Sequence, residues 1–149
     1  RFIREKSIYL PKNKDGIKRF EDGYGNELRI FDIDYMKRIE ILEIGNNCLK
    51  KVSKFVLEGF DELRSVSVGT NSFYLDKKNR EGSKCVIMKG NKYVIINCNQ
   101  LRELTIGMWS FYCYESLILK NLPSLQYIHL NIYSFVWFHS AVFQSKRIE

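Results

Sequence analysis

The sequence predicts a β-rich solenoid with two short strands per turn and little helix. One apolar pattern of 11 residues occurs four times, and its starts lie 24, 38 and 24 residues apart. Apolar and polar residues alternate within each pattern, as they do along strands. No stretch carries apolar residues at the i, i+3, i+4, i+7 spacing of an amphipathic helix. A period of this length indicates stacked units, each of which buries its apolar face only against its neighbours.

The four repeats begin at residues 39, 63, 101 and 125 and are apolar at positions one, four, six and eleven. Each start predicts a strand followed by a turn at position seven, where three repeats have glycine: Gly45, Gly69 and Gly107. Asn131 replaces glycine in the fourth repeat, which fits because asparagine also tolerates left-handed backbone angles. Position nine is occupied by Asn47, Asn71, Trp109 and Tyr133.

A second short strand is predicted in each turn, because another run of β-branched and aromatic residues separates successive patterns. Gly59, Asn97 and Asn121 stand four residues before the next repeat, where we expect a second bend. The two asparagine side chains are expected to bond backbone groups in that bend. The second strands are predicted at 55–57, 93–95, 117–119 and 141–143.

The repeat that begins at residue 63 is 14 residues longer than its neighbours, and the extra residues lie within 74–92. Residues 74–92 carry six basic and two acidic side chains, so they hold more than half of the net charge of +7. We expect an excursion from the edge of the solenoid, such as a hairpin, and insertions of this kind often carry function. The candidate binding residues of this basic loop are Lys77, Lys78, Arg80 and Lys84.

Charge and hydropathy argue against two classes of partner. Outside the insertion the charges are nearly balanced, which disfavours an extended groove that follows nucleic-acid phosphates. The insertion also lacks the interleaved aromatic residues that stack bases. No apolar run approaches the roughly 18 residues of a membrane-spanning helix, so neither nucleic acid nor a membrane span is expected.

The two ends of the predicted solenoid differ. In a half-repeat cap at the N-terminal end, Phe31 and Ile33 are expected to point inward. Asp32 and Asp34 would point outward, since charges on a terminal strand keep it from pairing further. A fifth start would fall at the last residue, so we expect an open edge that stacks on a partner, or a chain that is a fragment of a longer array. The predicted parts are an N-terminal flank (1–28) and a solenoid (29–149) that starts with the cap (29–38).

The cysteines show no CxxC pair and no histidine at metal-ligand spacing. In the other repeats, small or apolar residues fill the positions of Cys48 and Cys98, so we expect buried free thiols. Free thiols favour a reducing, intracellular compartment, while a surface or secreted location stays open. The four cysteines are Cys48, Cys85, Cys98 and Cys113.

The pattern L-x-x-L-x-L-x-x-N-x-L resembles the leucine-rich repeat, with Asn47 and Asn71 at its asparagine position. The recurrent Gly-x-x-Ser-Phe at 69–73 and 107–111 is similar to the divergent repeats of BspA-like surface proteins and their protist relatives. The resemblance covers residues 29–149 and implies a right-handed coil that recognises proteins, at cell surfaces or in scaffolds. Because Trp109 and Tyr133 depart from the asparagine position, it does not imply a regular asparagine ladder.

Residues beside the inward pair of each first strand should point outward on a concave sheet. Concave faces are the usual ligand surface of solenoids, and Arg and Tyr are favoured at recognition hot spots. A solvated polar face without a ligand is the alternative. The predicted partner-binding residues are Arg64, Ser65, Ser67, Arg102, Glu103, Thr105, Gln126, Tyr127 and His129.

The second strands predict a column of β-branched apolar residues that also points outward. Strand propensity alone accounts for a single exposed valine. Four in register suggest either a stripe covered by the N-terminal segment or the insertion, or an assembly interface. The members of this valine stripe are Val56, Val94, Ile118 and Val142.

Little in the sequence suggests catalysis. The chain has two histidines and no GxSxG, HExxH or phosphate-binding glycine loop. We therefore expect no metal, no cofactor and no enzymatic activity. The expected function is protein–protein interaction through the concave sheet and the inserted loop. The alternative is a structural subunit that polymerises or docks through open solenoid edges and the valine stripe.

Overall fold

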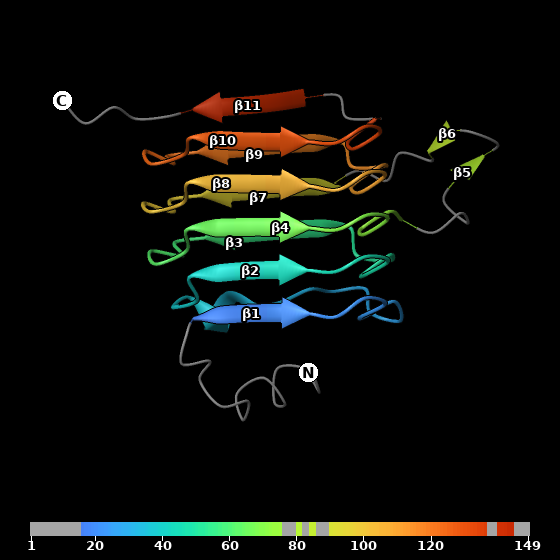
Figure 1. Cartoon of the computed structure of the whole chain (residues 1–149). Coiled ribbons are helices and arrows are strands. Elements are labelled where there is room, and N and C mark those ends of the chain that lie inside the picture. The colour runs from blue at the N-terminus through green and yellow to red at the C-terminus, as the bar shows by residue number, and fades with distance from the viewer. Residues whose placement is uncertain (1–15, 76–79, 82–83, 86–89, 137–139, 145–149) are drawn as a thin grey trace.

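In the computed structural model the chain forms a β-solenoid of about five turns (Figure 1). Two parallel sheets lie back to back, and the side chains between them form one core. Within the described part of the chain, helix is limited to the 3-10 turn η1 (Asp34–Met36). The β-rich solenoid with little helix is therefore confirmed. The structure describes residues 16–75, 80–81, 84–85, 90–136 and 140–144.

One strand of each sheet comes from each turn, and neighbouring strands pair in parallel. Figure 1 shows a right-handed coil, because the strands in front run to the right, those behind return, and each turn lies above the last. Sheet A contains β1 (Ile17–Phe20), β2 (Ile41–Ile44), β4 (Ser65–Val68), β8 (Glu103–Ile106) and β10 (Tyr127–Leu130). Sheet B contains β3 (Lys54–Glu58), β7 (Lys92–Ile96), β9 (Ser116–Lys120) and β11 (Ser140–Gln144). The insertion contributes an antiparallel pair, β5 (Arg80–Glu81) and β6 (Lys84–Cys85).

The solenoid starts earlier than the sequence pattern indicates. Strand β1 lies within the expected N-terminal flank, yet it pairs with β2 in the same register as the later turns. Its inward residues are Lys18 and Phe20, opposite Leu42 and Ile44. The lysine at an inward position breaks the apolar pattern, so the sequence did not predict this turn. Its ammonium group lies 5.0 Å from the centre of the Phe20 ring.

The expected cap at 29–38 is not a strand. Sheet B begins with β3, and the residues before η1 pack on the core without extending the sheet. Ile33 is buried, and the Phe31 ring stacks on Phe55 with centroids 6.1 Å apart. The inward orientation of Phe31 and Ile33 is therefore confirmed, while the hydrogen bonding of a strand is absent from this described segment.

The turn glycines allow the backbones of successive turns to approach closely. They do not supply left-handed backbone angles. None of the three glycines at position seven has a positive φ. A Cβ atom on Gly107 would instead lie 2.4 Å from the carbonyl carbon and oxygen of Gly69 in the turn below. The expectation that these residues supply left-handed angles is wrong, since the positive φ falls two and four residues later. The left-handed residues there are Gly23, Gly25, Asn47, Leu49, Asn71, Phe73, Trp109, Phe111, Tyr133 and Phe135.

In the second bend, Gly59, Asn97 and Asn121 do have a positive φ. The Asn121 side-chain amide donates to Asn97 Oδ1 at 2.9 Å, so the bond joins two side chains of successive turns. The Asn121 amide therefore bonds a side chain and not the backbone group that was expected.

Aromatic rings stack along the axis of the core. The ring centroids of Phe73 and Phe111 are 4.6 Å apart and those of Phe111 and Phe135 are 5.1 Å apart, with nearly parallel planes. Phe55 and Tyr93 stack in a second column at 4.8 Å and meet Phe111 edge-on. Such pairs contribute about 0.5–1.5 kcal/mol each beyond the area they bury.

Two buried serines connect successive turns through the backbone. The Ser72 hydroxyl donates to the Gly45 carbonyl at 2.8 Å and accepts the Cys48 N–H at 3.0 Å. Ser110 repeats both bonds one turn later, with the carbonyl of Gly69 and the N–H of Ser72. Each hydroxyl thus satisfies backbone groups that the turn would otherwise leave buried and unpaired.

Replacing Gly107 by Ala should destabilise the fold by about 3 kcal/mol, because the new methyl group collides with backbone that cannot move aside. Chemical denaturation followed by circular dichroism measures the loss. The control is Gly23→Ala, where φ is +81° but no atom lies within 4 Å of the added Cβ, so about 1 kcal/mol is expected. Equal losses in the two variants would contradict the close-approach explanation.

Two buried tyrosines provide a matched pair of deletions. The Tyr114 hydroxyl donates to the Val52 carbonyl at 2.6 Å, whereas the Tyr93 hydroxyl has no hydrogen-bond partner in the described part of the chain. Tyr114→Phe should cost about 1–2 kcal/mol, because it leaves a buried carbonyl unpaired. Tyr93→Phe should leave stability unchanged or raise it. Urea unfolding of both variants tests this, and a larger loss for Tyr93→Phe would contradict it.

Candidate functional site

The outer face of sheet A brings the predicted partner-binding residues together. Strand pairing places Ser65, Glu103 and Tyr127 side by side across three turns. A second row of Ser67, Thr105 and His129 runs parallel to it, two residues further along each strand. Arg64, Arg102 and Gln126 precede the strands and form a third row joined by N–H to carbonyl bonds between turns.

Both faces of the stack are parallel sheets. Figure 1 looks onto sheet A, with the strands of sheet B behind it. Both sides of each turn are strands, which repeat at the same spacing of about 4.8 Å. A concave sheet A stays a prediction, while the expected residues do share one face.

Charges on this face are paired at its N-terminal end. Arg19 Nε lies 2.7 Å from Glu43 Oε2, and Arg64 Nη2 lies 2.9 Å from Glu40 Oε1. These exposed pairs add little stability, but they neutralise the first turns. Arg102, further along the stack, has no ion pair among the described residues. Its guanidinium group is therefore available to an acidic ligand.

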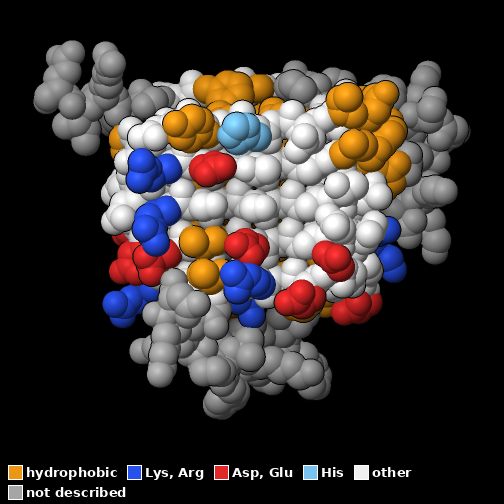
Figure 2. All heavy atoms as spheres, viewed as in Figure 1, with side chains coloured by type: hydrophobic (Ala, Val, Ile, Leu, Met, Phe, Trp, Pro, Cys, Tyr) orange, Lys and Arg blue, Asp and Glu red, His pale blue; other side chains and the backbone are white. Residues whose placement is uncertain are grey.

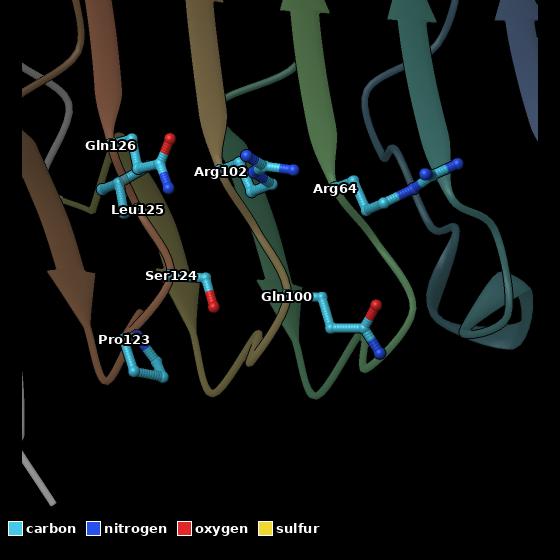
Figure 3. Close-up of a pocket in the computed structure, with 7 residues that line it drawn as sticks. All are labelled: Arg64, Gln100, Arg102, Pro123, Ser124, Leu125 and Gln126. Atoms are coloured by element: carbon cyan, nitrogen blue, oxygen red, sulfur yellow. The ribbon is translucent and has the colours of Figure 1, made fainter.

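A groove of about 530 Å³ opens where the strands of sheet A begin. Figure 3 shows Arg64 and Arg102 at neighbouring strand starts, with Gln100 and Ser124 on the bends below them. The Ser124 hydroxyl donates to the Asn99 carbonyl at 2.7 Å, which joins two successive bends. The lining residues are Arg64, Gln100, Arg102, Pro123, Ser124, Leu125 and Gln126.

Hydrogen-bond donors dominate the polar lining of the groove. Two arginines and two glutamines line it, and no acidic residue is among its lining residues. Guanidinium groups match carboxylate and phosphate oxygens in a bidentate geometry. At the C-terminal side of the same face, Tyr127 is 56% exposed and its ring lies parallel to that of His129, with centroids 6.1 Å apart. The arrangement suits an anionic group flanked by an apolar contact.

No family model, curated protein or solved structure matches the chain. Among them, no three of His, Cys, Asp and Glu lie close enough to hold one metal ion. The described residues also contain no helix that is long and apolar enough to cross a membrane.

The valine stripe lies in register on the outer face of sheet B. Val56 pairs with Val94, Val94 with Ile118 and Ile118 with Val142. The two ends of the stripe are exposed, at 43% for Val56 and 40% for Val142, but Val94 is only 8% exposed. The stripe is therefore not one continuous exposed surface.

The insertion forms the expected hairpin. Strands β5 and β6 pair antiparallel, with Arg80 opposite Cys85 and Glu81 opposite Lys84. Figure 1 shows this pair projecting beside the stack, away from both sheets. The side chains of Arg80 and Lys84 lie outside the described residues, as do Lys77 and Lys78 altogether. Their part in binding stays a prediction.

The cysteines differ in whether they are free or disulfide-bonded. Cys48 and Cys98 are buried free thiols, as predicted. Cys113, whose state the repeat positions did not predict, is disulfide-bonded. The side chain of the remaining cysteine, Cys85, lies outside the described residues. A disulfide weakens the sequence argument for a reducing compartment.

An aromatic ridge on the first bend was not predicted from the sequence. The rings of Trp109 and Tyr133 stack with centroids 4.4 Å apart, at the position that holds asparagine in two earlier turns. Met108 and Ile132 flank them and are 42% and 63% exposed. The change from asparagine to aromatic residues at position nine was the signal in the sequence.

The two free thiols should resist alkylation in the native protein. Burial raises the pKa of both the Cys48 and the Cys98 thiol, which lowers the thiolate fraction that reacts. At pH 8 their labelling by iodoacetamide should be more than about tenfold slower than in urea. Peptide mapping by mass spectrometry measures each site. Equal rates in the two conditions would show that the thiols are accessible.

Proposed function

We propose that the chain is a non-enzymatic protein-interaction module that binds an acidic segment of its partner on the outer face of sheet A. The observation that carries the proposal is the donor-lined groove in which Arg102 has no ion pair among the described residues. A carboxylate seated in the groove would receive charge-assisted hydrogen bonds from Arg102.

The scaffold supports this use of the face. The groove residues lie beside β4, β8 and β10, which pair with one another in sheet A, so little ordering accompanies binding. Tyr127 adds an exposed aromatic surface of the kind found at binding hot spots. The basic insertion has the same sign of charge, and we propose it as a second contact for an acidic partner.

Membership of the leucine-rich-repeat proteins, in their divergent BspA-like form, stays a proposal. The repeat pattern and the parallel sheet A support it. Two features lie outside the repeat pattern: the aromatic residues at position nine and the second sheet.

Fluorescence anisotropy with a labelled glutamate-rich peptide tests the site. Arg102→Glu should weaken binding by about tenfold or more, because it places a like charge against the ligand, and added salt should weaken wild-type binding. The control is Lys120→Glu, the same charge change on an exposed residue at the end of β9 in sheet B. An uncharged peptide and a single-stranded oligonucleotide are measured as comparison ligands.

Three results would overturn the proposal. The first is equal binding by the wild type and Arg102→Glu. The second is an equal loss in the Lys120→Glu control, which would assign the effect to net charge. The third is tighter binding of the oligonucleotide than of the acidic peptide, which would favour nucleic acid.

A structural subunit of a larger assembly is the second candidate function. The observation in its favour is the exposed apolar surface of the last turn, where Leu130 and Phe143 are 47% and 61% exposed. Surfaces of this kind mark contacts with other molecules.

A further inference from the structure

We propose that the disulfide of Cys113 joins it to Cys85, so that a covalent tether holds the inserted hairpin of β5 and β6 beside the first bend of the solenoid. The tether makes the position of this basic excursion depend on the redox state of the protein. It concerns the attachment of the insertion and does not depend on the function proposed for the groove on sheet A.

Elimination identifies the partner of Cys113. The chain contains four cysteines, and Cys113 is disulfide-bonded. Cys48 and Cys98 are free and buried, so neither is the second half of that bond. The remaining cysteine of the chain is Cys85, the last residue of β6. The bond therefore connects a turn of the solenoid to the second strand of the hairpin.

The returning end of the insertion lies against the segment that contains Cys113. The side-chain amide of the buried Asn91 donates to the Cys113 carbonyl at 3.3 Å. The Asn91 carbonyl accepts the N–H groups of Glu115 and Ser116, at 2.9 and 3.3 Å. The Glu115 carboxylate accepts the N–H of Gly90 at 3.1 Å. These bonds fix the returning chain next to Cys113.

The departing end of the insertion lies against the same segment. The register of sheet A relates β4 to β8 by 38 residues, and the same separation relates Leu75 to Cys113. The rings of Tyr74 and Tyr112 follow this register, with centroids 5.3 Å apart. Leu75 and Cys113 are each 3% exposed. The chain therefore leaves and re-enters the solenoid where Cys113 is buried.

The chain between the hairpin and the solenoid is short enough for the bond. Cys85 precedes Gly90 by five residues, and Gly90 is hydrogen-bonded to Glu115. An extended chain covers about 3.3–3.6 Å per residue, so these five residues span at most about 18 Å. A disulfide needs its two Cα atoms about 5.5–6 Å apart. A return that is less than fully extended brings Cys85 to Cys113.

The hairpin needs an attachment because it is too small to be stable alone. Its strands have two residues each, and they form a sheet of their own. An isolated two-stranded hairpin is marginally stable at best in water. Figure 1 shows the pair beside the stack, at the ends of the sheet A strands and away from both sheets. A covalent bond from β6 to a buried position of the solenoid supplies the order that sheet packing does not.

The tether forms and breaks by exchange of two electrons. A protein or small-molecule disulfide oxidises the Cys85 and Cys113 thiols, takes up their two electrons and two protons, and leaves as two thiols. A dithiol reductant reverses the step: it closes to its own disulfide, and both cysteines become thiols. Cys48 and Cys98 stay outside this exchange because they are buried away from other sulfurs. An oxidising compartment therefore favours the tethered hairpin, and a reducing one favours the released hairpin.

Peptide mapping without reduction tests the pairing. The full chain is refolded in a glutathione redox buffer, then unfolded, and its free thiols are alkylated with iodoacetamide. Trypsin should release residues 85–89 cross-linked to residues 103–120, and Cys48 and Cys98 should carry the label. Alkylated Cys85, or a bond from Cys113 to a second copy of the chain, would overturn the proposal.

Limited proteolysis of the native protein tests the consequence for the hairpin. Dithiothreitol should raise the rate of tryptic cleavage within residues 76–89 by about tenfold, because a hairpin without its tether opens more often. Cleavage after Lys120, at the end of β9, is the internal control and should stay unchanged. Equal cleavage of the insertion with and without dithiothreitol would contradict a tether that orders the hairpin.

A pair of cysteine variants separates the tether from other effects of reduction. Cys85→Ser should show fast cleavage of the insertion without reductant, and dithiothreitol should add nothing further. Circular dichroism should show an intact solenoid, because β6 belongs to neither of its two sheets. The control is Cys98→Ala, which removes a free thiol and should keep the slow, reductant-sensitive cleavage of the wild type. Slow cleavage in Cys85→Ser would overturn the proposal, and none of these results bears on peptide binding at the groove.

Discussion

In-register stacking of successive turns is the constraint on which the rest of the structure depends. Each strand forms parallel hydrogen bonds with the corresponding strand of the next turn, so residues one repeat apart lie directly above one another. The insertion does not disturb this, because Val68 still pairs with Ile106 at a separation of 38 residues. Every position of the repeat thereby becomes a column of side chains along the axis.

The columns explain the residue choices in the turn. A residue with a side chain at Gly107 would strike the backbone of Gly69 beneath it, so glycine fits there. In the next turn the same position holds Asn131, whose side-chain amide donates to the Ile106 carbonyl. A hydroxyl at Ser72 or Ser110 reaches the backbone of the turn below, so that column accepts a small polar residue. Rings in the phenylalanine column stack because the backbone repeats at nearly the distance that stacked rings prefer. The left-handed backbone at these phenylalanines is strained by about 1 kcal/mol or more each, and the packing of the rings offsets it.

Columns also change composition along the axis, and this change gives a repetitive fold distinct ends. The outer face of sheet A begins with paired charges, continues with Arg102, which has no ion pair in the described part of the chain, and finishes with Tyr127 and His129. The first bend changes from Asn47 to Trp109 at one position of the repeat. Turns of the same backbone geometry therefore present chemically different surfaces. Figure 2 shows acidic and basic side chains over the earlier turns and hydrophobic ones over the later turns.

Much of the fold and of the candidate surface could be predicted from the sequence. The alternation in each repeat predicted the strands, and the repeat spacing alone predicted that Ser65, Glu103 and Tyr127 share one face, as the strand pairing shows. The insertion was predicted as an excursion with a hairpin as one form, and β5 with β6 is that hairpin. The first turn was missed because Lys18 breaks the apolar pattern, even though its backbone obeys the register.

The sequence by itself determined the class of fold, the register of the turns and the position of the insertion, because these depend on a periodicity that every repeat carries. Only the tertiary structure decided why glycine lies at Gly107, which arginine of the described groove lacks an ion pair and which cysteine is disulfide-bonded. It also decided that Val94, within the valine stripe, is nearly buried. Those properties arise from contacts between turns, and a contact between two turns depends on distances that no single repeat contains.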